Sequence, residues 1–192
     1  MRDQVAWTTG GTRLGFLALD RNGNGVIDGA GELLGQAVAG LRRPDGPATS
    51  VADLAAFDRA DHGGNGDGLI SAADAVFAQL RVWVDANHDG VSQPGELLTL
   101  TQAGIAAIDL TAQPVGRRDR YGNVFRARAV VHLTNGHQTT VWDVFLVARP
   151  SAPSAGAAAG FAWPGAGGSR PIATGLAGLG AGLVVIGLCF SR

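Results

Sequence analysis

Oxygen-bearing side chains recur on alternate residues in three glycine-punctuated segments of this 192-residue chain. Carboxylate, amide and carbonyl oxygens are the ligands of Ca²⁺, which takes about six to eight of them at roughly 2.3–2.6 Å. In a calcium loop the side chains at positions 1, 3 and 5 converge on the ion, and glycine at position 6 permits a sharp turn. The carbonyl at position 7 coordinates, and an acid near position 12 closes the shell. We name the three segments loops 1 to 3 and predict that they bind calcium.

Loop 3 (residues 85–96) follows this spacing throughout. Its expected ligands are the side chains at positions 1, 3, 5 and 12 and the carbonyl at position 7, namely Asp85, Asn87, Asp89, Glu96 and Val91. The one departure is Ser92 at position 8, where an aliphatic residue usually pairs with a neighbouring loop.

Loop 1 (residues 20–32) has an aliphatic residue, Ile27, at position 8. Its expected ligands are the side chains of five residues and one carbonyl, namely Asp20, Asn22, Asn24, Asp28, Glu32 and the carbonyl of Val26. Glu32 comes one residue later than position 12. Either the loop is stretched or Asp28 contributes more of the coordination.

Loop 2 (residues 63–74) is the least regular. Its expected ligands are Asn65, Asp67, the carbonyl of Leu69, and Asp74. Position 1 is Gly63, which has no side-chain oxygen. The missing acid must therefore come from Asp58 or Asp61, across a glycine-containing insertion.

The repetition of the pattern distinguishes it from ordinary turn chemistry. A single Asp-x-Asn-x-Asp-Gly string is often only a turn, because Asn, Asp and Gly favour turn conformations without any ion. Here the pattern occurs three times, and ten of the 16 carboxylates lie in or beside the loops. Calcium is the expected cofactor.

Composition and the remaining polar residues point to a binding module and not to an enzyme. A net charge of −1 argues against a nucleic-acid partner held by electrostatics. The four histidines are scattered, and no serine stands in a nucleophile-elbow context. The single cysteine, Cys189, allows no intrachain disulfide. We therefore expect no catalytic residues.

The apolar patterning predicts an α+β fold in residues 1–148. Short helices are expected from Ser50, from Ser71 and after Glu96, packed around the calcium loops. Strands are expected at 15–19 and 105–110. Alternating segments 124–134 and 139–148 flank Asn135-Gly136, a strong hairpin signal. A small antiparallel sheet ending in a C-terminal hairpin should complete the domain.

The C-terminal residues predict a membrane anchor. Residues 149–171 are rich in Pro, Ala and Gly, as in a linker. Residues 172–190 carry no charge, and a helix of that length just spans a hydrocarbon core of about 30 Å. An apolar tail is the alternative. Charged residues interrupt any N-terminal signal peptide. We expect attachment to the cell envelope or surface, with the calcium domain outside.

Several segments resemble bacterial EF-hand-type calcium modules of exported, haemolysin-like and surface polypeptides. They are residues 19–35, 65–83 continuing into loop 3 and Gly104-Ile105, 118–126 and 143–146. The resemblance implies calcium binding and export, and it implies no reaction. In such modules an acid several residues before Asn-Gly-Asp-Gly is common, which favours Asp58 over Asp61. The alternative function is a dockerin-like adhesion or assembly module with a protein partner.

Overall fold

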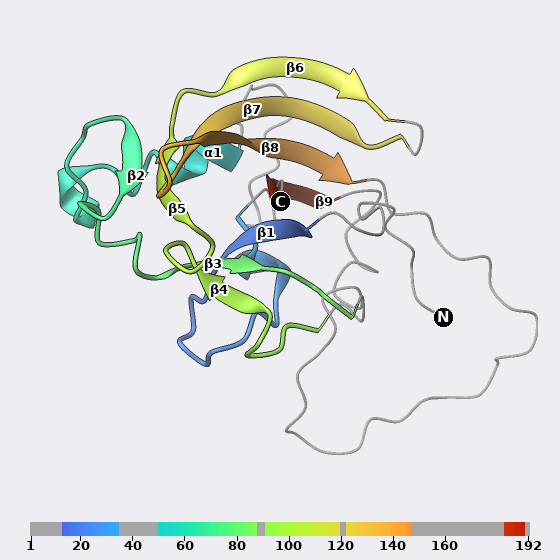
Figure 1. The fold of residues 1–192 in the computed structure, drawn as a ribbon, viewed down its shortest axis with the longest axis horizontal. Helices are drawn as coiled ribbons and strands as arrows, with labels where there is room; N and C mark the ends of the chain where they lie inside the picture. The colour runs from blue at the N-terminus through green and yellow to red at the C-terminus, as the bar shows by residue number, and fades with distance from the viewer. Residues whose placement is uncertain (1–12, 35–49, 88–90, 120–121, 147–182, 191–192) are drawn as a thin grey trace, which may run out of the picture.

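A computed structural model describes residues 13–34, 50–87, 91–119, 122–146 and 183–190. Nine strands form one antiparallel sheet (Figure 1). They are β1 (Arg13–Leu19), β2 (Leu69–Ser71), β3 (Leu80–Trp83), β4 (Leu97–Thr99), β5 (Ile105–Asp109), β6 (Gln113–Arg118), β7 (Val124–Leu133), β8 (Gln138–Leu146) and β9 (Leu183–Phe190). Their order is β2-β5-β7-β8-β9-β1-β3-β4, and β6 pairs with β7 beside β5.

The hairpin expected around Asn135-Gly136 is present as β7 and β8. Gly136 has a φ of 82°, a left-handed conformation that glycine adopts without steric cost. The two strands pair from Val124↔Phe145 to His132↔Gln138. This long pair forms the middle of the sheet.

The predicted α+β class is wrong, because strands dominate the described residues and the helices there are single turns. α1 (Ser50–Leu54) is five residues long, and two 3-10 turns are η1 (Ala30–Glu32) and η2 (Ala60–His62). The helix expected from Ser71 is instead a series of turns. The segment after Glu96 enters β4 directly. The Ser71 amide is held by the Asp74 carboxylate within a turn, and the chain re-enters the sheet at Leu80 and at Leu97.

The predicted membrane helix is also wrong. Its last eight residues, Leu183–Phe190, form β9, which lies between β8 and β1. Register runs from Val141↔Leu188 to Leu146↔Leu183 on one side and from Arg13↔Phe190 to Phe16↔Gly187 on the other. Across the described part of the chain, no helix is long and apolar enough to cross a membrane. The membrane partner and the envelope location deduced from that helix lose their basis. Residues 149–171, the predicted linker, lie outside the described ranges.

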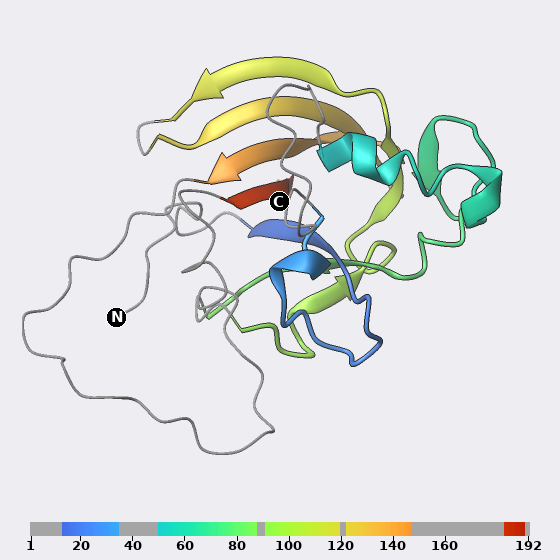
Figure 2. The same ribbon diagram turned by 180° about the vertical axis from the view of Figure 1, so that it is seen from behind.

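Two apolar clusters use opposite faces of the strands. Alternation along β1 directs Leu17 and Leu19 into the larger cluster and Phe16 and Ala18 into the smaller one. α1, the short helix beside the sheet in both ribbon views (Figures 1 and 2), contributes Val51 and Leu54 to the larger cluster. The smaller cluster contains Ala18, Ile27, Leu33, Trp83 and Val144. Loop 1 is therefore anchored in the core through Ile27 and Leu33, not merely attached at the sheet edge.

Candidate calcium-binding loops

Loop 1 begins where β1 ends, and the Asp20 carboxylate organises its backbone. Asp20 Oδ1 accepts hydrogen bonds from the amides of Gly23 (2.8 Å) and Asn24 (3.2 Å), and Oδ2 accepts one from Gly25 (2.8 Å). Gly23 and Gly25 have φ values of 71° and 79°. The glycines thus allow the chain to wrap around one carboxylate.

The asparagines of loop 1 continue this wrapping. Asn22 Oδ1 accepts from the amide of Asn24 (2.9 Å), and Asn24 Oδ1 accepts from that of Val26 (2.9 Å). The side-chain Nδ2 of Asn24 donates to Asp28 Oδ2 at 3.1 Å. Hydrogen bonds therefore connect four of the expected side-chain ligands of loop 1, namely Asp20, Asn22, Asn24 and Asp28.

Glu32 closes loop 1 from η1. Its Oε2 accepts from the amides of Asp28 (2.9 Å) and Gly29 (3.3 Å), and its Oε1 accepts from that of Arg21 (3.3 Å). Glu32 is only 5% exposed. The acid that stands one residue late in the sequence therefore reaches the start of the loop.

In loop 2 the structure brings Asp58 to the position that Gly63 leaves without an oxygen. Asp58 Oδ1 accepts from the Gly66 amide at 2.9 Å, and Oδ2 accepts from the Gly68 amide at 3.0 Å. These glycines correspond to Gly23 and Gly25 of loop 1. Asp61 lies outside, where it forms an exposed ion pair with Arg59.

The remaining acids of loop 2 repeat the arrangement of loop 1. Asp67 Oδ1 accepts from the amide of Leu69 (2.9 Å), and Asp67 Oδ2 accepts from the Asn65 side chain (2.8 Å). Asp74 accepts from the amides of Ser71 (2.7 Å) and Asn65 (3.3 Å). Asp58 is 8% and Asp74 3% exposed. Loop 2 thus carries one buried acid at each end.

Glu96 closes loop 3 in the same way. Its Oε1 accepts from the Ala86 amide at 2.9 Å, and its Oε2 accepts from the amide of Gln93 and from the indole Nε1 of Trp83, both at 3.3 Å. Asp85, Asn87 and Val91 lie in the described part of this loop. Asp89 lies outside the described residues, as part of 88–90.

The three closing acids share one pattern of hydrogen bonds. Each accepts from the amide three residues before it, in the pairs Gly29–Glu32, Ser71–Asp74 and Gln93–Glu96. Each also accepts from an amide near the start of its own loop. No group of three or more His, Cys, Asp or Glu residues close enough to hold a metal occurs among the described residues. Coordination here would depend on asparagine and carbonyl oxygens as well as carboxylates.

Three contributors could not be assigned from spacing alone. Ser92, noted as a departure, hydrogen-bonds to Ile27 across 65 residues. Trp83 of β3 donates to Glu96, 13 residues further along the chain. Gly64 packs against the backbone of Asp58, where an added Cβ would lie 2.1 Å from the Asp58 carbonyl carbon. Each of these contacts joins residues that are separated in the sequence, so the spacing within one loop does not predict it.

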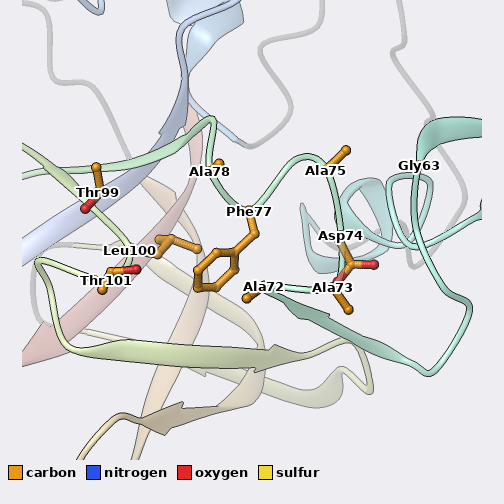
Figure 3. A pocket seen from close by; sticks show the side chains of 10 residues that line it. All are labelled: Gly63, Ala72, Ala73, Asp74, Ala75, Phe77, Ala78, Thr99, Leu100 and Thr101. Carbon is orange, nitrogen blue, oxygen red and sulfur yellow. The ribbon is translucent and has the colours of Figure 1, made fainter.

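A shallow groove of about 590 Å³ lies beside loop 2 (Figure 3). Phe77 and Leu100 form an apolar floor, and Thr99 and Thr101 add hydroxyls on one side. The lining residues are Gly63, Ala72, Ala73, Asp74, Ala75, Phe77, Ala78, Thr99, Leu100 and Thr101. The groove offers an apolar contact surface next to Asp74, the buried closing acid of loop 2.

The described fold and site define a β-sheet domain with three acid-closed loops. The SPM domain family matches residues 1–147, and the chain belongs to that family. The chain is also 39% identical over 136 residues, 70% of its length, to the iron-regulated protein FrpA of Neisseria meningitidis serogroup C. That match spans 12% of the relative's length. Assignment to an EF-hand-type module family is therefore wrong: the family shown is the SPM domain.

Proposed function

We propose that this domain binds calcium through loops 1 to 3 and that the bound ions stabilise its fold, without catalysis. The observation that carries the proposal is a set of four buried carboxylates, at most 8% exposed, namely Glu32, Asp58, Asp74 and Glu96. None lies within ion-pair distance of a cationic side chain among the described residues.

Buried carboxylates of this kind favour a cation. A charge removed from water is costly unless it is paired, strongly hydrogen-bonded or bound to a metal. Backbone amides supply part of the compensation in each loop. A carboxylate oxygen retains further acceptor capacity after one or two such bonds. The asparagine oxygens and loop carbonyls can complete an oxygen shell of the kind calcium takes.

A calorimetric titration with Ca²⁺ tests the proposal. We expect saturable binding by the wild-type chain, and Glu96→Gln should lose the equivalent bound by loop 3. Asp61→Asn is the matched control, because Asp61 is exposed and pairs with Arg59 outside loop 2. Mg²⁺ should bind more weakly, since it demands near-octahedral geometry at about 2.0–2.1 Å. Absence of calcium binding by the wild-type chain would exclude the proposed function.

A second candidate function is calcium-dependent protein interaction. The apolar groove beside loop 2 favours this candidate, because Asp74 of loop 2 is one of its lining residues. Ordering of loop 2 by an ion would fix one wall of the groove. In a calcium-dependent pull-down, Ala73→Arg should abolish capture of a partner while the melting temperature stays unchanged. Ala73 is exposed, so the folded chain can accept the arginine. Capture that is equal in calcium and in chelator would exclude this candidate.

A further inference from the structure

A buried side-chain bridge joins loop 1 to loop 3. The Ile27 amide donates to Ser92 Oγ at 2.6 Å, and the Ser92 hydroxyl donates to the Ile27 carbonyl at 3.1 Å. Ile27 is 1% and Ser92 4% exposed. Both residues occupy position 8 of their loops, directly after the expected carbonyl ligands Val26 and Val91. The serine hydroxyl therefore serves as both acceptor and donor for the backbone of the other loop.

A second connection runs through the smaller apolar cluster. Trp83 donates to Glu96, the closing acid of loop 3, and packs in the cluster that contains Ile27 of loop 1 and Leu33 just after it. Leu33 directly follows the closing acid Glu32 and bridges to Ala18 of β1. β1 in turn pairs with β3, in the register Phe16↔Trp83. Both closing acids are therefore attached to one packed unit.

Loop 2 is connected differently. Ile70, at position 8 of loop 2, lies in β2 and pairs with Ile108 of β5. It packs in the larger cluster, not the one shared by loops 1 and 3. Loop 2 also projects from another part of the sheet than loop 1 in both ribbon views (Figures 1 and 2). No contact of the kind formed by Ser92 joins it to another loop among the described residues.

We infer that loops 1 and 3 bind calcium as a cooperative pair coupled through the Ser92 hydroxyl, whereas loop 2 binds independently. This inference rests on the proposed function. An ion in loop 1 positions the Val26 carbonyl and with it the adjoining Ile27 amide. The short bond to buried Ser92 transmits that position to the Val91 carbonyl of loop 3. Because coupling is reciprocal, each ion should raise the affinity for the other by the same factor.

Backbone amide signals in an NMR titration with Ca²⁺ can follow the loops separately. The amides of Gly25, Gly68 and Ala86 each donate to a carboxylate of loops 1, 2 and 3, respectively. In the wild-type chain, Gly25 and Ala86 should share one cooperative midpoint, and Gly68 should titrate separately. In Ser92→Ala the Gly25 and Ala86 midpoints should separate, and the cooperativity should be lost. Ser92→Thr keeps a hydroxyl and should keep the shared midpoint.

A double-mutant cycle with Glu96→Gln gives the size of the coupling. With Ser92 present, Glu96→Gln should weaken calcium binding at loop 1 by about fivefold or more, the lower range of typical couplings. In Ser92→Ala the same change should alter loop 1 affinity less than about twofold. Asp74→Asn, in loop 2, is the control and should leave loop 1 unchanged.

Several results would overturn the inference. Independent Gly25 and Ala86 midpoints in the wild type would do so, as would shared midpoints that persist in Ser92→Ala. A Gly68 midpoint that coincides with theirs would exclude an independent loop 2. If Ser92→Ala fails to fold, the effect of Glu96→Gln on loop 1 in the wild type still decides the matter. If none of the three amides responds to calcium, the proposed function itself fails.

Discussion

Asp58 and Gly64 depend on each other in loop 2. The two Asp58 carboxylate oxygens accept from the amides of Gly66 and Gly68, and the Asp58 carbonyl also accepts from Gly66 at 2.8 Å. Gly64 lies directly against the Asp58 backbone. Any side chain at position 64 would push Asp58 away from the loop. The insertion between Asp58 and Asn65 is therefore a tightly packed turn.

Gly64→Ala should destabilise the domain. Its Cβ would lie 2.1–2.5 Å from three Asp58 backbone atoms, so the loop must shift. Overpacking of this kind costs about 1–3 kcal/mol. Gly95→Ala is the matched control, because nothing lies within 4 Å of the added Cβ and no left-handed φ is involved. Urea unfolding of both variants measures the difference. Equal stabilities would contradict the described packing at Gly64.

Asp58→Asn should weaken loop 2 even without calcium. The amide has one acceptor oxygen, so an NH₂ group would face the amide of Gly66 or Gly68. The Gly66 amide keeps its bond to the Asp58 carbonyl, so the variant loses one hydrogen bond to a charged group, which contributes about 1.5–3 kcal/mol. Asp61→Asn, at an exposed ion pair, should change stability by less than about 1 kcal/mol. Unfolding in chelator compares the two. A larger loss of unfolding free energy in Asp61→Asn than in Asp58→Asn would mean that Asp61, and not Asp58, is the acid of loop 2.

At the scale of elements, β9 completes the sheet between β8 and β1. It pairs with Val141–Leu146 on one side and with Arg13–Phe16 on the other. Without it, both neighbouring strands would present unpaired backbone groups. A stretch distant in sequence from every other described strand thus joins the two halves of the sheet.

Truncation after residue 182 tests this role of β9. We expect the melting temperature to fall by at least about 2–4 °C, because over 1 kcal/mol of pairing is lost and each 1 kcal/mol shifts it by roughly 2–4 °C in a chain of this size. Removal of residues 191–192 alone is the control and should have little effect. Equal melting temperatures for the two truncations would mean that β9 does not contribute to the fold.

Local signals predicted some elements and misassigned others. Asn135-Gly136 specifies its hairpin because the turn residues alone favour the required backbone. The apolar run in Leu183–Phe190 suits either a buried central strand or a membrane helix, and hydropathy cannot distinguish them. Its Val184-Val185-Ile186 run carries the β-branched residues typical of strands. Ser71 resembled a helix start, yet its amide donates to Asp74 within a turn.

In the candidate site, too, local features could be predicted from the sequence and long-range contacts could not. The loops and most of their oxygen side chains were recognisable from spacing, because each loop is continuous in sequence. Asp58 could only be chosen by resemblance, since it lies before a glycine-containing insertion. The Ser92–Ile27 bridge joins residues 65 positions apart and depends on the pairing of β1 with β3. Contacts of that range follow from the complete fold.

At the scale of the whole molecule, calcium would act as a folding ligand. Three loops anchored in the same sheet place several carboxylates within one small domain, and their mutual repulsion disfavours the compact state. An ion that binds only the folded chain stabilises it by about 2.7 kcal/mol per site at a hundredfold excess over Kd. Loops 1 and 3 would then tie β1 and β3 to the segments that follow them, and loop 2 would fix β2, which lies within it.

The melting temperature in calcium and in chelator tests this account most directly. We predict that about 5 mM Ca²⁺ raises it by at least roughly 5 °C over chelator, as expected for one saturated site in a chain of this size. The triple variant Asp20→Ala, Asp85→Ala, Glu96→Ala should lose most of that rise, because it removes acids of loops 1 and 3. An identical melting temperature in calcium and in chelator for the wild-type chain would contradict the account.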